Sequence, residues 1–217
     1  MRKGLTELVF ILDRSGSMNG LESDTVGGFN SMLSKQKKEE GEALVSVVLF
    51  NEQSRVVRDR AELDSVEPMK VEDYQARGCT ALLDAVGDAV KHIGTIHKYA
   101  RSEDRPERTL FVITTDGLEN SSRRYGYSEV KRLIERQQEK YGWEFIFLGA
   151  NIDAAAEAQR FGICREHAAQ YVCDEAGTAL NYEVLSETVA CVRKGKGISG
   201  AALDRVRKDC RKRGGGE

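Results

Sequence analysis

Oxygen-bearing side chains follow an apolar run near the start of the chain. The stretch "LVFILDRSGSM" runs five apolar residues into Asp13 and then places Ser15 and Ser17 at alternate positions. Two further oxygen donors follow, Thr80 in "RGCTAL" and Asp116 in "TLFVITTD". Such a set, without histidine or cysteine, suits Mg²⁺ or Mn²⁺, which keep open positions for water or for a carboxylate of a partner. The alternatives for the first stretch alone are a capped turn and a nucleophilic serine.

The elements that must position these side chains are predicted from hydrophobic patterning. Nearly continuous apolar runs, typical of parallel strands buried on both faces, occupy 7–12, 43–50, 109–115 and 144–150. Two weaker strands are predicted, an antiparallel hairpin partner at the sheet edge and a last short strand, at 55–63 and 169–174. Helical stripes lie between the strands, at 21–38, 80–100, 128–139, 153–161 and 178–192. We therefore expect a doubly wound α/β fold with a mostly parallel central sheet, one antiparallel edge strand and helices on both faces.

The predicted fold gives the oxygen donors a common location. Ligands of doubly wound sheets bind outside the carboxyl ends of the strands, where the strand order reverses. Asp13 follows the first strand, Asp116 follows the fourth, and Thr80 opens the long helix of 80–100. If the first and fourth strands are neighbours, the two carboxylates face each other across this crevice.

Taken together, the three motifs resemble a von Willebrand factor type A (VWA) domain, a Rossmann-like fold whose hallmark is the metal-ion-dependent adhesion site (MIDAS). The Asp-x-Ser-x-Ser pattern of that family is met by "DRSGS", its threonine by "RGCTAL" and its second aspartate by "TTDGLEN", over about residues 5–192. The resemblance implies that Ser15 and Ser17 coordinate Mg²⁺ directly, with Mn²⁺ as the alternative ion. It further implies that Thr80 coordinates directly or through water, and that Asp13 and Asp116 hold coordinating waters.

The same resemblance implies a function in binding. The open metal position would accept an Asp or Glu side chain of a partner protein, and the chain is similar to the compact, intracellular prokaryotic members. We therefore expect a divalent-metal-dependent protein–protein interaction module, an accessory protein and not an enzyme. Its specificity would come from the loops around the ion, with Arg123 and Arg124 as candidates for contacting an acidic partner.

Composition narrows the possible classes of function and partner. The chain has 217 residues and a formal net charge of −2, which gives no global attraction to nucleic acid or membrane. It has no apolar run of the roughly 20 residues that cross a bilayer and no signal-type start, so we expect a cytoplasmic protein with no membrane contact. Its five cysteines form no CxxC pair, so neither a disulfide framework nor a zinc site is expected.

The chain is expected to divide into a VWA domain of 1–192 and a basic, Gly-rich tail of 193–217 that is mobile or weakly helical. The tail supplies an alternative function: its nine Lys or Arg against three acids could contact nucleic acid, although no aromatic residue is interleaved for base stacking. A metal-dependent phosphoester hydrolase is the other alternative. The Gly-x-Ser-x-Gly elbow of serine hydrolases is absent around Ser15 and Ser17.

Overall fold

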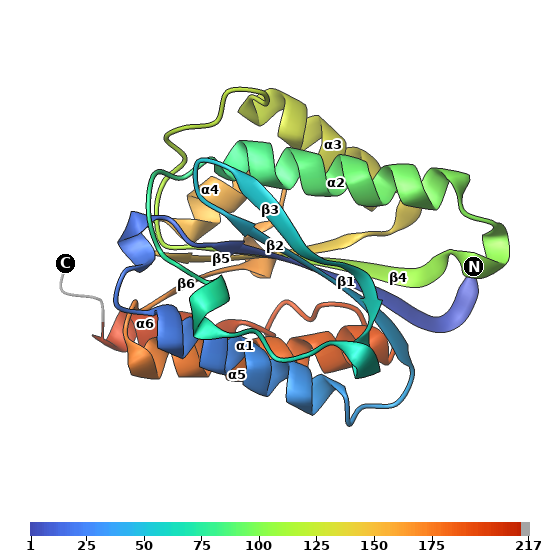
Figure 1. Ribbon diagram of the computed structural model, residues 1–217, viewed down its shortest axis with the longest axis horizontal. Coiled ribbons are helices and arrows are strands. Elements are labelled where there is room, and N and C mark those ends of the chain that lie inside the picture. Colours follow the sequence, from blue (N-terminus) through green and yellow to red (C-terminus); the bar gives the residue numbers. More distant parts are fainter. Residues whose placement is uncertain (214–217) are drawn as a thin grey trace.

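The computed structural model describes residues 1–213 and forms one α/β sandwich, with a six-stranded sheet between two layers of helices (Figure 1). The strands are β1 (Arg2–Asp13), β2 (Glu42–Phe50), β3 (Ser54–Glu62), β4 (Pro106–Thr115), β5 (Glu144–Ala150) and β6 (Ala168–Tyr171). The helices are α1 (Glu22–Gln36), α2 (Leu82–Tyr99), α3 (Tyr127–Tyr141), α4 (Ala154–Arg160), α5 (Glu175–Arg193) and α6 (Asp204–Arg213).

The strand order is β3-β2-β1-β4-β5-β6, and every neighbouring pair is parallel except the edge pair of β2 and β3. The predicted fold class is confirmed, including the antiparallel edge strand. The order reverses direction at β1 and β4, which lie side by side with Leu12 opposite Thr114. Ligand sites of doubly wound sheets lie outside the carboxyl ends of the strands at such a reversal.

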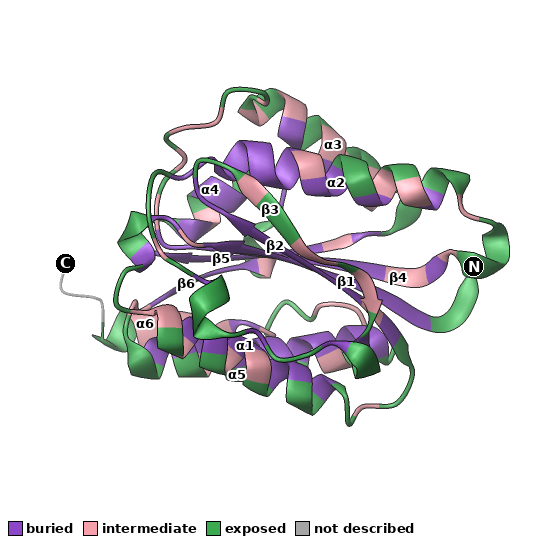
Figure 2. Cartoon of the chain, viewed as in Figure 1, coloured by how far each residue is buried: buried purple, intermediate pink, exposed green. Residues whose placement is uncertain are grey.

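Both faces of the sheet are covered. Helices α1, α5 and α6 lie on one face, and α2, α3 and α4 lie on the other (Figure 1). Along β1, Phe10 and Leu12 pack into the core under α1 and α5, whereas Val9 and Ile11 pack against the opposite helices. The central strands are accordingly buried along most of their length (Figure 2). Burial on both sides explains why these strands are continuous apolar runs.

The segment beyond residue 193 packs against this domain. Residues 204–213 form α6, which lies beside β6 and α5, and Leu203 and Val206 are buried in the core below the sheet. The Arg207 guanidinium also donates to the Ala168 carbonyl at 3.0 Å. Buried apolar side chains and arginine contacts, including Arg205 with Glu183 and Arg213 with Asp174, therefore hold this strongly basic segment against the domain. Residues 214–217, the end of the predicted tail, lie outside the described residues.

Within residues 1–213, no helix is both long enough and apolar enough to cross a membrane.

Candidate metal site

The candidate site lies at the carboxyl edge of the sheet, on the left in Figure 1. Asp13 is the last residue of β1, Asp116 directly follows β4, and Thr80 lies two residues before α2. Because β1 and β4 are parallel neighbours, both aspartates leave the sheet at the same edge. The expectation that the first and fourth strands are adjacent is thus confirmed.

The predicted side chains are brought together in space. Ser15 Oγ lies 3.1 Å from Ser17 Oγ, and Ser17 Oγ in turn donates a short hydrogen bond to Asp116 Oδ1. Thr80 approaches the same point, since a Cβ added at Gly117 would lie 3.5 Å from Ser17 Oγ and 3.6 Å from Thr80 Oγ1. Gly117 therefore lies against both hydroxyls, and the three segments meet at this point.

Backbone hydrogen bonds hold the three loops of the site against one another. The Gly16 N–H donates to the Gly78 carbonyl at 2.9 Å, which joins the serine loop to the threonine loop. Gly78 has a φ of +78°, a left-handed conformation that favours glycine. The Asn120 N–H donates to the Thr80 carbonyl at 3.0 Å, and its side chain Oδ1 accepts from the Thr80 N–H at 2.9 Å. The loop after β4 is therefore fixed to Thr80 in both directions.

Asp13 is almost fully buried, with an exposed fraction of 1%. Its Oδ1 accepts from the Ser15 N–H at 2.7 Å and its Oδ2 from the Thr115 hydroxyl at 2.6 Å. Burial raises the pKa of the Asp13 carboxyl from 3.8 to about 6, and these hydrogen bonds oppose the rise because they favour the ionised form. The nearby charge of Asp116 adds to the rise.

Asp116 carries an unsatisfied acceptor. Its Oδ1 is bonded by Ser17, but its Oδ2 is buried and has no hydrogen-bond partner within residues 1–213. Burial also raises the pKa of this carboxyl. An unpaired buried acceptor costs about 1–3 kcal/mol, and a cation with its bound water is the kind of group that removes this cost. The site residues therefore fit a hard divalent ion.

The donor chemistry agrees with this fit. Within the described part of the chain, no three or more His, Cys, Asp or Glu side chains cluster in a way that could hold a metal. The candidate site depends instead on serine and threonine hydroxyls together with two carboxylates. Oxygen-only donor sets of this kind suit Mg²⁺ and Mn²⁺ rather than softer ions.

The rim of the site is open to solvent. Ser17 and Cys79 are exposed. Leu118, two residues after Asp116, is a large apolar side chain that is also exposed. The thiol expected near the site is thus at its surface. A partner side chain can approach the serine and threonine hydroxyls from this direction.

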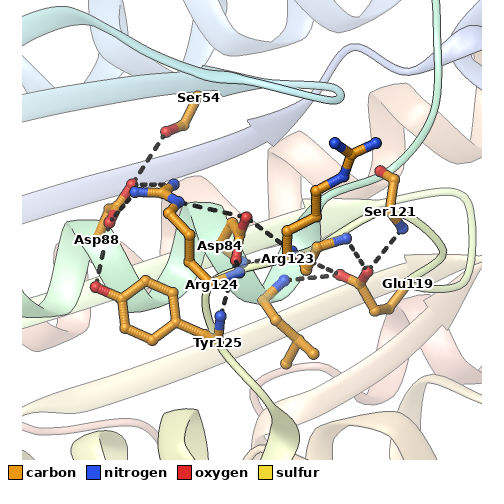
Figure 3. Close-up of polar contacts among 10 residues, drawn as sticks. Ser54, Asp84, Asp88, Glu119, Ser121, Arg123, Arg124 and Tyr125 are labelled. Carbon is orange, nitrogen blue, oxygen red and sulfur yellow. Dashed lines mark hydrogen bonds and ion pairs between the residues drawn. The ribbon is translucent and has the colours of Figure 1, made fainter.

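Figure 3 shows how the loop after β4 is anchored to the start of α2. The Asp84 carboxylate accepts the backbone N–H groups of Arg123, Arg124 and Tyr125 at 2.9–3.1 Å. Burial alone would raise the pKa of Asp84, but these bonds and the Arg124 charge lower it below its ordinary value. Glu119 adds a second anchor, because its Oε2 accepts from the Leu83 N–H at 2.8 Å.

The two arginines expected to contact a partner differ in this network. The Arg124 guanidinium bonds both oxygens of Asp88, at 2.9 and 2.6 Å, and also contacts Asp84 at 3.4 Å. Arg123 forms no ion pair within residues 1–213, and its side chain extends away from the cluster (Figure 3). Arg124 is therefore a structural residue of the loop, and only Arg123 retains a free charge.

Sequence reasoning missed three residues that shape the site. Thr115 holds Asp13, Asn120 holds Thr80, and the buried Tyr74 hydroxyl donates to the Asp13 carbonyl. Thr115 is visible in "TTD", but nothing in the pattern distinguishes its hydroxyl from that of any strand threonine. The roles of Tyr74 and Asn120 depend on loop geometry that has no periodic signal.

The two histidines of α2 contact different carboxylates. His92 Nε2 lies 2.9 Å from Asp59, and His97 Nε2 lies 3.1 Å from the buried carboxylate of Glu7. The two rings thus contact different acids at different places on α2, as their spacing of five residues requires.

Comparison with known proteins identifies the fold. No family model matches the sequence, and no curated protein matches it. Among solved structures, the chain is similar to the von Willebrand factor type A protein from Catenulispora acidiphila, with a TM-score of 0.57 and 20% identity over 85% of this chain and 42% of that chain. It is also similar to proximal thread matrix protein 1 from the mussel byssus with a zinc-occupied MIDAS motif, with a TM-score of 0.60 and 16% identity over 86% and 46%.

A third similar structure is the manganese-loaded TRAP protein of Plasmodium vivax, with a TM-score of 0.58 and 16% identity over 83% of this chain and 73% of that chain. The chain spans less than half the length of the first two. At these identities the matches establish the fold.

Proposed function

We propose that this chain, which has the fold of a VWA domain, is a divalent-metal-dependent protein-binding module. In this function a Mg²⁺ or Mn²⁺ ion at the carboxyl edge of the sheet accepts an Asp or Glu side chain of a partner protein. The observation that carries the proposal is the convergence of Ser15, Ser17 and Asp116 within one hydrogen-bonded chain, beside Thr80.

The residues divide into those that hold the ion and those that hold the loops. Ser15, Ser17 and Thr80 would supply hydroxyl ligands, and Asp13 and Asp116 would act through coordinated water. Keeping the carboxylates outside the first coordination sphere would leave the ion strongly electrophilic, so that an incoming carboxylate is attracted. The unpaired Oδ2 of Asp116 supports this role, since it is a buried acceptor with a place for a donor.

Binding is favoured over catalysis by what surrounds the hydroxyls. Within residues 1–213, neither Ser15 nor Ser17 is hydrogen-bonded to a histidine that could act as its base. The exposed Leu118 beside the site is suited to contact with a protein surface.

Protein is favoured over nucleic acid as the partner. The arginines of the C-terminal segment are mostly engaged within the chain: Arg205 pairs with Glu183 and Glu187, and Arg213 pairs with Asp174 and Asp209. Much of the positive charge that suggested phosphate contacts is therefore already neutralised.

Metal binding is tested first with Mn²⁺, because the electron paramagnetic resonance signal of the free ion disappears when it binds. We expect the wild-type chain to bind one Mn²⁺, and Ser17→Ala and Asp116→Ala to bind it far more weakly. Asp104→Asn is the matched control, since Asp104 is exposed and precedes β4 at the opposite edge of the sheet.

Partner binding is tested by capture from native extract on wild-type and Asp13→Ala protein, each with Mg²⁺ and with EDTA, followed by mass spectrometry. The proposal expects a protein retained only by wild type with Mg²⁺. Retention that ignores both changes, or a wild-type chain that binds no Mn²⁺, would refute it. Phosphatase turnover that is lost in Asp13→Ala would establish the hydrolase alternative instead.

A further inference from the structure

Three arginines gather on one side of the candidate metal site, each from a different segment. Arg14 lies between the metal-site residues Asp13 and Ser15, and its N–H donates to the Phe50 carbonyl at 2.7 Å. Arg77 lies in the loop before α2, and its N–H donates to the Arg14 carbonyl at 2.9 Å. Arg55 lies on β3, next to the hairpin that begins after Phe50. We call Arg14, Arg55 and Arg77 the arginine cluster.

The arginine cluster is not neutralised within the chain. Nine other arginines of the described chain have carboxylate partners, as Arg124 has in Asp88. Within residues 1–213, none of the three forms an ion pair, and Arg14 Nε is buried without any hydrogen-bond partner. The backbone brings the three residues together, because the Arg77 N–H bonds the Arg14 carbonyl, the Arg14 N–H bonds the Phe50 carbonyl, and Phe50 pairs with Ser54, next to Arg55. Burial lowers the pKa of Arg14, and the charges of Arg77 and Arg55 lower it further.

Three carboxylates lie near these arginines: Glu52, and also Glu67 and Asp73, which line a pocket together with Arg55 and Arg58. Glu52, at the tip of the hairpin between β2 and β3, is exposed. Its negative charge raises the pKa of Arg14, whereas the charges of Arg77 and Arg55 lower it. Its carboxylate lies against the Gly78 backbone, where an added Cβ would meet Glu52 Cδ at 2.5 Å. Counting Arg58, four guanidiniums lie around these three carboxylates, so the surface keeps a small net positive charge.

The place of the cluster connects it to the metal site. Arg14 is part of the Asp-x-Ser-x-Ser loop, and the Arg77 bond to Arg14 is followed along the chain by the Gly78 bond to Gly16. In an extended segment, side chains on the same face recur about 7 Å apart, at about 3.3 Å per residue. An acidic residue two positions from a metal-bound carboxylate would therefore reach outward over the loops that carry the arginines.

We propose that the arginine cluster selects partner segments in which the metal-binding carboxylate is accompanied by further acidic side chains. The inference rests on the proposed metal-dependent function, and it names an acidic peptide segment as the partner chemistry. Guanidiniums pair well with carboxylates through paired N–H donors. Because the cluster is largely exposed, its contribution falls as salt rises.

The test uses two fluorescein-labelled peptides of Gly and Ser, one with a single central Glu and one with three Glu at alternate positions. Their affinities are measured by fluorescence anisotropy with excess Mg²⁺, at low and at physiological salt. We expect the three-acid peptide to bind wild type about three- to tenfold more tightly, the range that one or two exposed ion pairs supply. The preference should shrink at higher salt.

The variant is Arg55→Gln with Arg77→Gln, because both side chains are exposed and Arg14 is partly buried in the loop. We expect the ratio of the two affinities to fall toward one. The matched control is Arg132→Gln with Arg136→Gln on α3, which also removes two exposed arginines but lies on the other helical layer. The control should keep the wild-type ratio.

The outcomes separate this inference from the proposed function. Equal affinities in wild type, or a preference that survives Arg55→Gln with Arg77→Gln, would overturn the inference, and binding that still requires Mg²⁺ would leave the metal function standing. A three-acid preference that persists in EDTA and in Asp13→Ala would keep the arginine cluster and reject the metal function. No binding of either peptide, or tighter binding of an oligonucleotide of similar charge, would overturn the inference as well.

Discussion

The buried carboxyl of Asp13 predicts that the metal-free protein is stabilised when this site residue loses its charge. The folded pKa of about 6 lies above the ordinary 3.8, so the folded state holds its proton more tightly than the unfolded state does. Stability therefore falls as pH rises from about 4 to 6, and it stays low above that range. Since each pKa unit corresponds to about 1.4 kcal/mol, the buried charge costs about 3 kcal/mol at neutral pH.

The substitution that removes the charge with least disturbance is Asp13→Asn. The asparagine oxygen can accept from the Ser15 N–H as Asp13 Oδ1 does, at 2.7 Å in the native protein. Its amide would donate to Thr115, whose hydroxyl can donate instead to the Gly117 carbonyl, 3.0 Å away. Because both native bonds have replacements, most of the electrostatic gain should survive, about 1–3 kcal/mol at neutral pH.

The assay is urea unfolding in EDTA at pH 4.5, 5.5 and 7.5, with exposed Asp104→Asn as the control. We expect the Asp13→Asn variant to differ least from wild type at the lowest pH and to exceed it increasingly up to pH 7.5. Added Mg²⁺ should then stabilise wild type more than the variant, because the ion compensates the buried charge. A difference between variant and wild type that does not change with pH would refute the reasoning.

Three further predictions concern the scaffold, and each is measured as a change in the free energy of unfolding in urea at pH 7. Gly28→Ala should destabilise the protein by about 1–3 kcal/mol, because its Cβ would overlap the Tyr182 ring, 2.8 Å from Cγ. The neighbouring Gly27→Ala has open space and should stabilise the protein by about 0.5–1 kcal/mol. Equal effects of the two substitutions would contradict this packing. Arg193→Lys should cost about 2 kcal/mol of stability. The buried guanidinium donates to the Gln36 carbonyl at the end of α1 at 2.5 Å and to the Gly41 carbonyl before β2 at 2.7 Å. A loss under about 0.5 kcal/mol would show that these bonds are dispensable. Glu7→Gln should cost about 2–4 kcal/mol of stability, because this fully buried carboxylate pairs with Arg60 of β3 and His97 of α2. Unchanged stability would mean that these pairs are no better than neutral polar contacts.

The fold was predictable from the sequence where burial imposes a pattern. Strands β1, β2, β4 and β5 are buried on both faces, and that environment admits almost only apolar residues, so the buried part of each strand was found. Strand β1 begins five residues earlier than predicted, because Arg2, Lys3 and Gly4 are exposed and carry no apolar pattern. The edge strand β3 has no fully buried residue and its burial does not alternate regularly, because it lies at the sheet edge and its register against β2 shifts at two places. Helix α6 was harder to predict, since only Leu203 and Val206 bury apolar surface in a segment dominated by charge.

The candidate site was predictable to the extent that its residues follow strand ends. Asp13 ends β1, Ser15 and Ser17 follow within four residues, and Asp116 directly follows β4, so the sheet topology brings them to one edge. Their role as metal ligands stays a prediction. The arginine cluster was not predictable, because its three members come from a strand and two loops with no common spacing.

The energetics of the site connect its fold to the proposed function. Asp13 and Asp116 are both almost completely buried, and burial raises the pKa of both carboxyls. One oxygen of Asp116 is left without a donor in the described chain, although Ser15, Ser17 and Thr115 all supply hydroxyls nearby. A protein selected for stability alone would replace such carboxylates with neutral side chains. Their cost is explained if the native state includes a cation that they help to hold, and the increase in stability on adding Mg²⁺ measures how much of that cost the ion removes.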